Sequence, residues 1–298
     1  MTTDRRVLAI INPSSGPQRS QAIAASLHAE AESQGVHLVT AFTTPDLGAR
    51  HLAQNADEDI DTIIAVGGDG TVSEVIAGTL EKSVVVGIIP GGSTNMIARE
   101  LGIPSRHKDA ARVAIGDGVT TDIDVALAGD HVIVHMAGAG FDAAIMRDTS
   151  ARLKRRVRWA AYLPAGARNF NFPRFEFTGS IDGRPIAGKA RLILVAIGAS
   201  IVNPRIVVGK GIDRRDRVID LLIFDPPRLM NVSQIVLWTL AGRPEQSRWL
   251  THYRGQHIIL DSPIDVPFEV DGDYVGKLPI EISLYEEPVT VRVPIGAT

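Results

Sequence analysis

Short apolar runs alternate with longer segments of helical periodicity over the first third of the chain. Runs such as Ile63-Ile64-Ala65-Val66 are apolar at every position, which is typical of strands in a parallel sheet that helices cover on both faces. The helical segments end at stop signals such as Gly35 and Gly102, because glycine readily follows a helix C-terminus. We therefore expect strands at 6–12, 36–42, 62–66 and 84–90, and helices at 19–34, 47–54, 72–80 and 95–101.

From about Asp122 the pattern changes to short apolar strands separated by turn signals. Asp182-Gly183 and Asp271-Gly272 are dipeptides typical of tight turns between antiparallel strands. The segment 231–240 is predicted to be a helix within this half. The pattern thus predicts the α/β class, with a doubly wound parallel-sheet domain at 1–125 and an antiparallel, β-rich domain at 126–298. It leaves open whether the final strand returns to the first domain.

Composition limits the classes of function. The 298 residues carry a formal net charge of -3, which argues against a protein whose whole surface binds nucleic acid. The absence of cysteine excludes disulfides, thiolate metal sites and a cysteine nucleophile. Neither a signal-peptide pattern nor an uninterrupted apolar run of about 18 residues occurs. We expect a cytoplasmic protein whose contact with membranes, at the inner face, is peripheral.

Three loops with glycine follow predicted strands. The loop Gly67-Gly68-Asp69-Gly70-Thr71 stands directly before a predicted helix, where main-chain N–H groups point toward an incoming anion. Ligands of open α/β sheets bind at the carboxyl ends of the strands, so we expect the three loops to form one phosphate-binding crevice. For any single loop, a connecting turn with a helix cap is an equal explanation. The other two loops are Asn12-Pro13-Ser14-Ser15-Gly16 and Pro90-Gly91-Gly92-Ser93-Thr94-Asn95.

Other nucleotide-binding motifs are missing from the sequence. It contains no Gly-Lys-Ser/Thr phosphate loop and no His-Arg-Asp or Asp-Phe-Gly motif, so a P-loop enzyme and a protein kinase are not supported. The segment Gly138-Ala139-Gly140-Phe141-Asp142 matches the dinucleotide fingerprint loosely. We interpret its glycines as structural, because the region about twenty residues later is basic rather than acidic.

Two motifs carry a family resemblance. Gly68-Asp69-Gly70-Thr71 followed by Ser73-Glu74 is similar to the signature Gly-Gly-Asp-Gly-Thr-x-Asn-Glu, and 90–95 with Ala98-Arg99 is similar to a second signature. Together they resemble the diacylglycerol kinase catalytic-domain family, in particular its compact bacterial lipid kinases, which are related to sphingosine kinases. The resemblance spans nearly the whole chain, because further residues fall at the family's spacing: Asp124, 138–142, Asp216, Asp220 and 270–273.

The resemblance implies an ATP-dependent lipid kinase of phospholipid metabolism, with a nucleotide-binding α/β domain followed by a β-sandwich-like domain. The γ-phosphate of ATP would pass to a hydroxyl group of a lipid such as diacylglycerol, and Asp271 would be the general base. Phosphoryl transfer needs such a carboxylate and a cation that neutralises charge. The resemblance places a structural Mg²⁺ at Asp216 and the main chain of Arg214 and Val218, and we expect a catalytic Mg²⁺ near Asp69. The residues implied around ATP are Asn12, Pro13, Ser14, Ser15, Gly16, Thr43, Gly67, Gly68, Asp69, Gly70, Thr71, Glu74, Gly92, Ser93 and Asn95.

Three residues depart from the family pattern. Ser73 replaces the usual Asn, Met96 stands where many members have Asp, and His135 stands where Asn is common. Met96 removes a carboxylate from the nucleotide region, so a nucleotide-binding protein without kinase activity stays an alternative. An enzyme resembling NAD kinase is the other, because that family shares the Gly-Gly-Asp-Gly-Thr segment. For Asp271 alone, without the resemblance, a turn residue is the better explanation.

A basic cluster lies beside Trp159 and Tyr162. Cationic and aromatic side chains together suit anionic lipid headgroups, although a solvated helix face is the alternative. We expect a lipid substrate at a membrane surface and no nucleic-acid partner, and we leave a homodimer open. The cluster consists of Arg152, Lys154, Arg155, Arg156 and Arg158.

Overall fold

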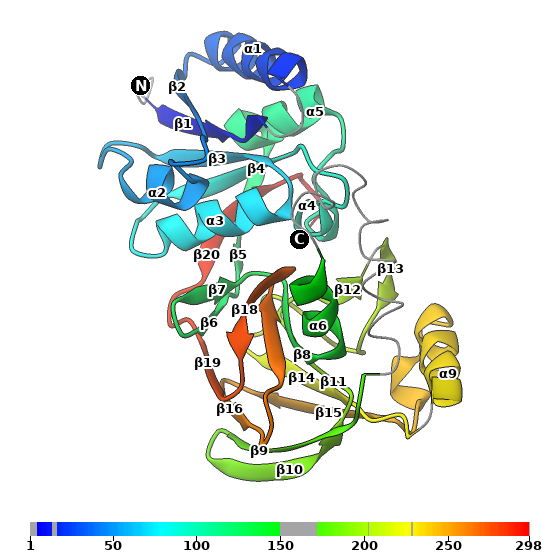
Figure 1. Cartoon of the computed structure of the whole chain (residues 1–298). Helices are drawn as coiled ribbons and strands as arrows, with labels where there is room; N and C mark the ends of the chain where they lie inside the picture. Colours follow the sequence, from blue (N-terminus) through cyan, green and yellow to red (C-terminus); the bar gives the residue numbers. More distant parts are fainter. Residues whose placement is uncertain (1–4, 14–16, 150–171, 202, 228, 298) are drawn as a thin grey trace. The chain divides into compact units, whose positions relative to one another are not determined.

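The computed structural model of the chain describes residues 5–13, 17–149, 172–201, 203–227 and 229–297. The chain divides into two units (Figure 1). Unit 1 consists of Met1–Ile123 and Glu287–Thr298, and unit 2 is Asp124–Glu286. Within the described ranges, no helix is long and apolar enough to cross a membrane.

Unit 1 is built on a six-stranded sheet in the order β2-β1-β3-β4-β20-β5. The neighbours from β2 to β20 pair in parallel, and β5 runs antiparallel to β20. Every residue of β3 is buried, as the uniformly apolar sequence of this strand predicts. The bounds are β1 Arg6–Ile11, β2 His37–Phe42, β3 Thr62–Gly67, β4 Val85–Pro90, β5 Val119–Ile123 and β20 Val289–Val293.

Helices cover both faces of this sheet. Figure 1 shows α1 and α5 on one face and α2 and α3 on the other. Helix α3 begins at Asp69, three residues before its predicted start, because the glycine in its first turn has low helix propensity and hides the pattern. The bounds are α1 Pro17–Ser33, α2 Ala49–Gln54, α3 Asp69–Thr79, α4 Met96–Glu100 and α5 His107–Arg112, followed by a π-helical turn at Val113–Asp117.

The described residues of unit 2 include two antiparallel six-stranded sheets and a small ribbon of β12 and β13. The sheet orders are β10-β9-β16-β19-β6-β7 and β15-β14-β11-β8-β17-β18. The strand bounds are β6 Ala126–Ala128, β7 His131–Ile133, β8 Met136–Gly140, β9 Phe175–Ile181, β10 Arg184–Ala190, β11 Leu192–Ala196, β12 Ser200–Ile201, β13 Asn203–Val207, β14 Ile219–Phe224, β15 Leu250–Gly255, β16 His257–Asp261, β17 Pro267–Val270, β18 Asp273–Lys277 and β19 Ile280–Leu284.

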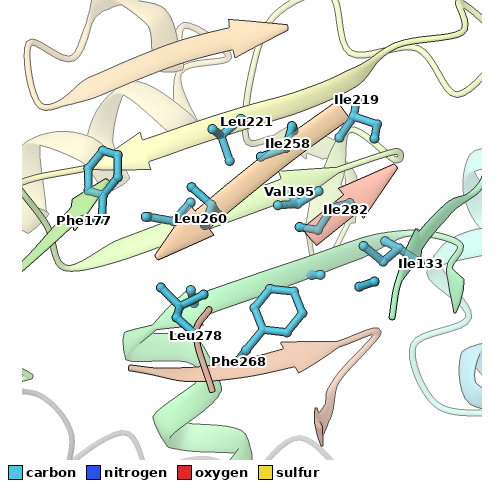
Figure 2. Packing of buried hydrophobic residues seen from close by; sticks show 14 of the residues in the cluster. Ile133, Phe177, Val195, Ile219, Leu221, Ile258, Leu260, Phe268, Leu278 and Ile282 are labelled. Atoms are coloured by element: carbon cyan, nitrogen blue, oxygen red, sulfur yellow. The ribbon is translucent and has the colours of Figure 1, made fainter. Parts of the chain in front are cut away.

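The two sheets of unit 2 pack face to face over one apolar core (Figure 2). Phe177, Ile258 and Leu260 enter it from the first sheet, and Val195 and Phe268 enter it from the second. Alternate residues of each strand point into this core, which is the arrangement of a β-sandwich. The prediction of an α/β fold with a parallel sheet and a separate antiparallel part is confirmed.

The second sheet is covered on its outer face as well. Ile235 of α9, Leu229–Leu240, packs there against a cluster that includes Leu194 and Leu222, so the predicted helix in this half is confirmed. Helix α6, Phe141–Asp148, packs on β8, β17 and β18. It begins directly after Gly140, the last residue of β8. Its first two residues belong to the segment 138–142, which matches the dinucleotide fingerprint loosely. A 3₁₀ turn at Pro244–Gln246 follows α9.

Candidate active site

The loop after β1 is tied to the start of α3, because β1 and β3 are neighbours in the parallel sheet. The main-chain N–H of Asn12 donates to the carbonyl of Val66 (2.9 Å), and its side-chain amide donates to Oγ1 of Thr71 (3.0 Å). Pro13 follows and is partly buried. The predicted loop residues 14–16 lie outside the described part of the chain.

Four glycines let the loops after β3 and β4 pack main chain against main chain. The N–H of Gly91 donates to the carbonyl of Gly67 (2.6 Å). A Cβ added to Gly92 would lie 2.6 Å from the Cα of Gly68, and one added to Gly91 would lie 3.1 Å from the Cα of Gly67. Larger residues would force the loops apart, because a close-packed interior has no free space to absorb them.

Asp69 joins the starts of α3 and α4. Its Oδ1 accepts a hydrogen bond from the main-chain N–H of Ile97 (3.0 Å), and its Oδ2 accepts one from the hydroxyl of Thr94 (2.9 Å). A carboxylate has about four acceptor positions, so two remain for a cation or for water. Gly70, the next residue, is exposed, with open space where a Cβ would lie.

Asn95 closes the loop after β4 on itself. Its Oδ1 accepts from the N–H of Gly92 (2.8 Å), and its Nδ2 donates to the carbonyl of the same residue (3.0 Å). Asn95 has a left-handed backbone, with φ of 49°, which asparagine tolerates better than most residues. The amide predicted to flank a nucleotide therefore also shapes the loop, while Ser93 is exposed. Met96 is buried, with 7% of its surface exposed, and packs inside unit 1.

Two other predicted residues have structural contacts. The carboxylate of Glu74 accepts a hydrogen bond from the N–H of Ala49 (2.9 Å) at the start of α2, where a negative charge is favourable. The N–H of Thr43 donates to the carbonyl of Ile11 (3.0 Å), which extends the pairing of β1 and β2 by one step. Thr43 therefore lies at the carboxyl end of the sheet, on the strand beside β1.

The geometry of unit 1 is that of an anion-binding edge. The loops after β1, β3 and β4 meet at the carboxyl ends of adjacent strands, and the loop after β3 leads directly into α3. Free main-chain N–H groups at a helix start and glycines without side chains suit a phosphate group.

Asp271 occupies the hairpin turn between β17 and β18 in unit 2, with φ of 48°. Its Oδ1 accepts hydrogen bonds from the N–H groups of His135 (2.9 Å) and Met136 (3.0 Å), and its Oδ2 accepts one from Val134 (3.0 Å). Its own N–H donates to the carbonyl of Met136 (2.8 Å). The carboxylate thus fixes the turn to the chain before β8. Asp273, two residues later, is exposed.

Two further acids lie beneath this turn. Glu269 is 5% exposed, and its Oε2 accepts a hydrogen bond from the N–H of Gly272 (2.6 Å). Burial and then the charge of Asp142 raise the pKa of Glu269 well above its usual range, and burial raises the pKa of Asp142 to about 7. Sequence reasoning missed Glu269 as a functional residue. The sequence feature that could have identified Glu269 is that it is the single acidic residue inside the apolar strand Pro267–Val270.

Asp216 lies in an acidic and basic cluster. It forms an ion pair with Arg254, whose Nε also donates to Oδ1 of buried Asp220 (3.1 Å). Burial raises the pKa of Asp216, the charges of Asp220 and Asp213 add to this, and Arg254 opposes it. Oδ1 of Asp216 and Oδ2 of Asp220 are buried and accept no hydrogen bond from the described residues.

These buried oxygens are of the type that Mg²⁺ prefers. The main-chain carbonyl of Arg214 accepts from the N–H of Asp124 (2.6 Å), and Val218, close in sequence, is half-buried. Among the described side chains, no three His, Asp or Glu residues form a metal-binding group. A cation here would need main-chain oxygens and water besides the carboxylates. The donor set therefore fits Mg²⁺ only with that help.

The predicted basic cluster, from Arg152 to Arg158, lies outside the described residues. His135, one of the departures from the family pattern, has its Nε2 at 2.9 Å from the carbonyl of Ser200. Ser73 lies partly buried on α3.

Comparison with known proteins places these loops in one family. Residues 6–128, which include all three loops, match the model of the diacylglycerol kinase catalytic domain. Diacylglycerol kinase of Bacillus subtilis is 28% identical over 287 residues, covering 94% of each chain. Diacylglycerol kinase of Staphylococcus epidermidis is 28% identical over 298 residues, covering 97% of this chain and 92% of the relative.

Solved structures share the fold. A crystal structure of a diacylglycerol kinase from Bacillus anthracis covers 99% of this chain, with 98% of its own length matched, a TM-score of 0.72 and 18% identity. Another solved chain from that organism has a TM-score of 0.81 at 20% identity and covers 100% of this chain and 98% of its own.

Proposed function

The chain matches the model of the diacylglycerol kinase catalytic domain over residues 6–128, and we propose that it is a lipid kinase that transfers the γ-phosphate of ATP to a hydroxyl group of diacylglycerol. The observation that carries the proposal is the matched domain at 6–128, whose glycine loops lie together at the carboxyl edge of the sheet. Such an edge suits the phosphates of ATP. We propose that the reaction takes place at a membrane surface, where this lipid is found.

The loops of unit 1 would hold the nucleotide. Exposed Gly70 and Ser93 offer a main-chain N–H and a hydroxyl to phosphate oxygens, and Asn12 and Asn95 keep the loops in place. Mg²⁺ bound with ATP neutralises charge on the phosphates. The two remaining acceptor positions of Asp69 would hold it, and a second Mg²⁺ would be held in unit 2.

That second cation is proposed to be structural. Asp216 and the main chain of Arg214 and Val218 would hold it, with the buried free oxygen of Asp220 adding to the negative charge. Arg254 compensates part of that charge, so the site would keep its fold without the cation and gain stability with it.

Asp271 is the proposed general base, as the carboxylate at the hairpin turn between β17 and β18. Its three hydrogen bonds with main-chain N–H groups also give it a structural role, so a variant must separate the two. Asp273 is the matched comparison, because it is an exposed carboxylate of the same turn.

The test is transfer of labelled phosphate from ATP to a panel of lipids and to NAD, for the wild type, Asp271→Asn and Asp273→Asn. Loss of a general base costs about 10²-fold or more in turnover. We expect label in diacylglycerol, and such a loss in Asp271→Asn with unchanged ATP binding. Label in NAD would contradict the lipid kinase. A turnover loss confined to Asp273→Asn would move the base to that residue.

A further inference from the structure

Glu269 and Gly138 lie directly opposite each other in the pairing of β17 with β8. Directly opposed residues of antiparallel strands place their side chains on the same face, with Cβ atoms about 5 Å apart. The flanking pairs, Phe268 with Ala139 and Val270 with Ala137, face the core between the sheets. Glu269 therefore points to the outer face of this sheet, toward α6.

Asp142 fills the cross-strand position beside Glu269. A Cβ added to Gly138 would overlap Oδ2 of Asp142 and would lie 2.7 Å from its Oδ1. The side chain of Asp142 thus turns inward from α6 and lies over a buried glycine of β8. Gly138 is required here because any side chain would displace this carboxylate. This explains why the segment 138–142 has a glycine at its first position.

The carboxyl group of partly buried Asp142 therefore lies beside that of buried Glu269. Within the described residues neither has a basic partner, and Arg147 on the same helix is bonded to Asp148 (2.9 Å). The other charges that act on Glu269 are those of Asp271 and Asp273, and both are negative. Two adjacent carboxylates in such surroundings cannot both be ionised at neutral pH.

The contacts indicate which group holds the proton. Asp142 lies in the first turn of α6, where the helix dipole favours a negative charge, and its Oδ1 accepts from the N–H of Ala143 (2.7 Å). Among the described residues, Glu269 accepts a hydrogen bond only from the N–H of Gly272. The proton therefore resides mainly on Glu269.

We propose that Asp142 and Glu269 share one proton at neutral pH, and that this pair positions the Asp271-Gly272 turn. The turn is held at two points, by the three N–H groups that bind the carboxylate of Asp271 and by Oε2 of Glu269, which binds Gly272. The link to catalysis rests on the proposed function, because that turn carries the proposed base. The shared proton itself does not depend on it.

The pair gives stability a defined pH dependence. Folding raises both pKa values, so the contribution is fully present below the unfolded pKa values, near 4. The part due to Asp142 is lost as pH rises through about 7, and the part due to Glu269 is lost as pH rises through its own raised pKa. Where both groups are charged, their repulsion opposes the packing of α6 on the hairpin.

Glu269→Gln is the informative variant, since its amide imitates the protonated acid. The carbonyl of Gln accepts from Gly272, and its NH₂ donates toward Asp142. Because only Asp142 still titrates in this variant, we expect its melting temperature to fall less between about pH 5.5 and 8.5 than that of the wild type. Infrared spectra of the wild type at neutral pH should show one carboxylic-acid band more than those of the variant. Glu245→Gln, at an exposed glutamate of the turn Pro244–Gln246, is the matched control and should behave as the wild type.

Measurements of activity distinguish a role of Glu269 in positioning the turn from a role in folding alone. Glu269→Gln should keep the neutral kcat within about threefold and remove the ionisation of Glu269 from the pH profile. Glu269→Ala, which removes the carboxyl group that accepts from the Gly272 N–H, should lower kcat more than tenfold with KM for ATP unchanged. Parallel pH profiles of stability for the wild type and Glu269→Gln, without a difference in the carboxylic-acid band, would overturn the shared proton. Stability and infrared spectra can be measured even if no lipid is phosphorylated. The shared proton and the proposed kinase reaction can therefore be refuted independently.

Discussion

Replacing Gly92 with alanine tests the packing of the two glycine loops. The new Cβ would lie 2.6 Å from the Cα of Gly68 and 2.9 Å from Oδ1 of Asn95. Carbon atoms in contact prefer about 3.5–4.0 Å, so the loops must separate by about 1 Å. Overpacking of this kind costs about 1–3 kcal/mol, which lowers the melting temperature by about 5 °C in a chain of this size.

The same displacement should weaken ATP binding about tenfold or more, because a shift of about 1 Å misplaces the groups that meet the phosphates. Differential scanning fluorimetry gives the melting temperature, and titration calorimetry with Mg²⁺ and ATP gives the affinity. Gly70→Ala is the control for stability, since its Cβ enters open space at a helical position where alanine is favoured by about 1 kcal/mol. If Gly92→Ala equals the wild type in both measurements, the loop contact is not what shapes the site.

Three further predictions concern single contacts. Arg217→Met should lower the free energy of unfolding in urea by about 3 kcal/mol, because it leaves buried Asp124, which is 1% exposed, without its ion-pair partner. A decrease in unfolding free energy smaller than that expected for a surface ion pair would contradict this. Mg²⁺ at about 100 times its Kd should raise the unfolding free energy by about 3 kcal/mol, and Asp216→Asn should abolish the increase; equal shifts in both proteins would place the cation elsewhere. Thr71→Val removes the acceptor of the Asn12 amide and should cost about 1 kcal/mol in the same assay, whereas a neutral result would mean that water replaces the contact.

Periodicity predicted the elements of unit 1 well, because strands that are buried on both faces leave an uninterrupted apolar run. The short helices α5, His107–Arg112, and α6, Phe141–Asp148, were missed, since six to eight residues give too few turns for a helical period. The sheet to which β20 belongs was left open by the sequence. A strand's own pattern does not encode its partner, and β20 pairs with β4 and β5.

The candidate site was likewise predicted only in part from the sequence. The loop residues were predicted from local motifs, but Glu74 proved to contact the start of α2 and Asn95 to close its own loop. Such contacts depend on tertiary neighbours, as do the three N–H groups that Asp271 binds. The pairing of Glu269 with Asp142 requires the register of β17 against β8, which no motif contains.

The most direct test of the proposed reaction is its stoichiometry. The purified protein is incubated with ATP, Mg²⁺ and diacylglycerol in mixed micelles, and ADP and phosphorylated lipid are measured in the same sample. The account predicts one phosphorylated lipid for each ADP, and no ADP above background when the lipid is omitted. ATP turnover without phosphorylated lipid, or phosphate found only in NAD, would contradict it.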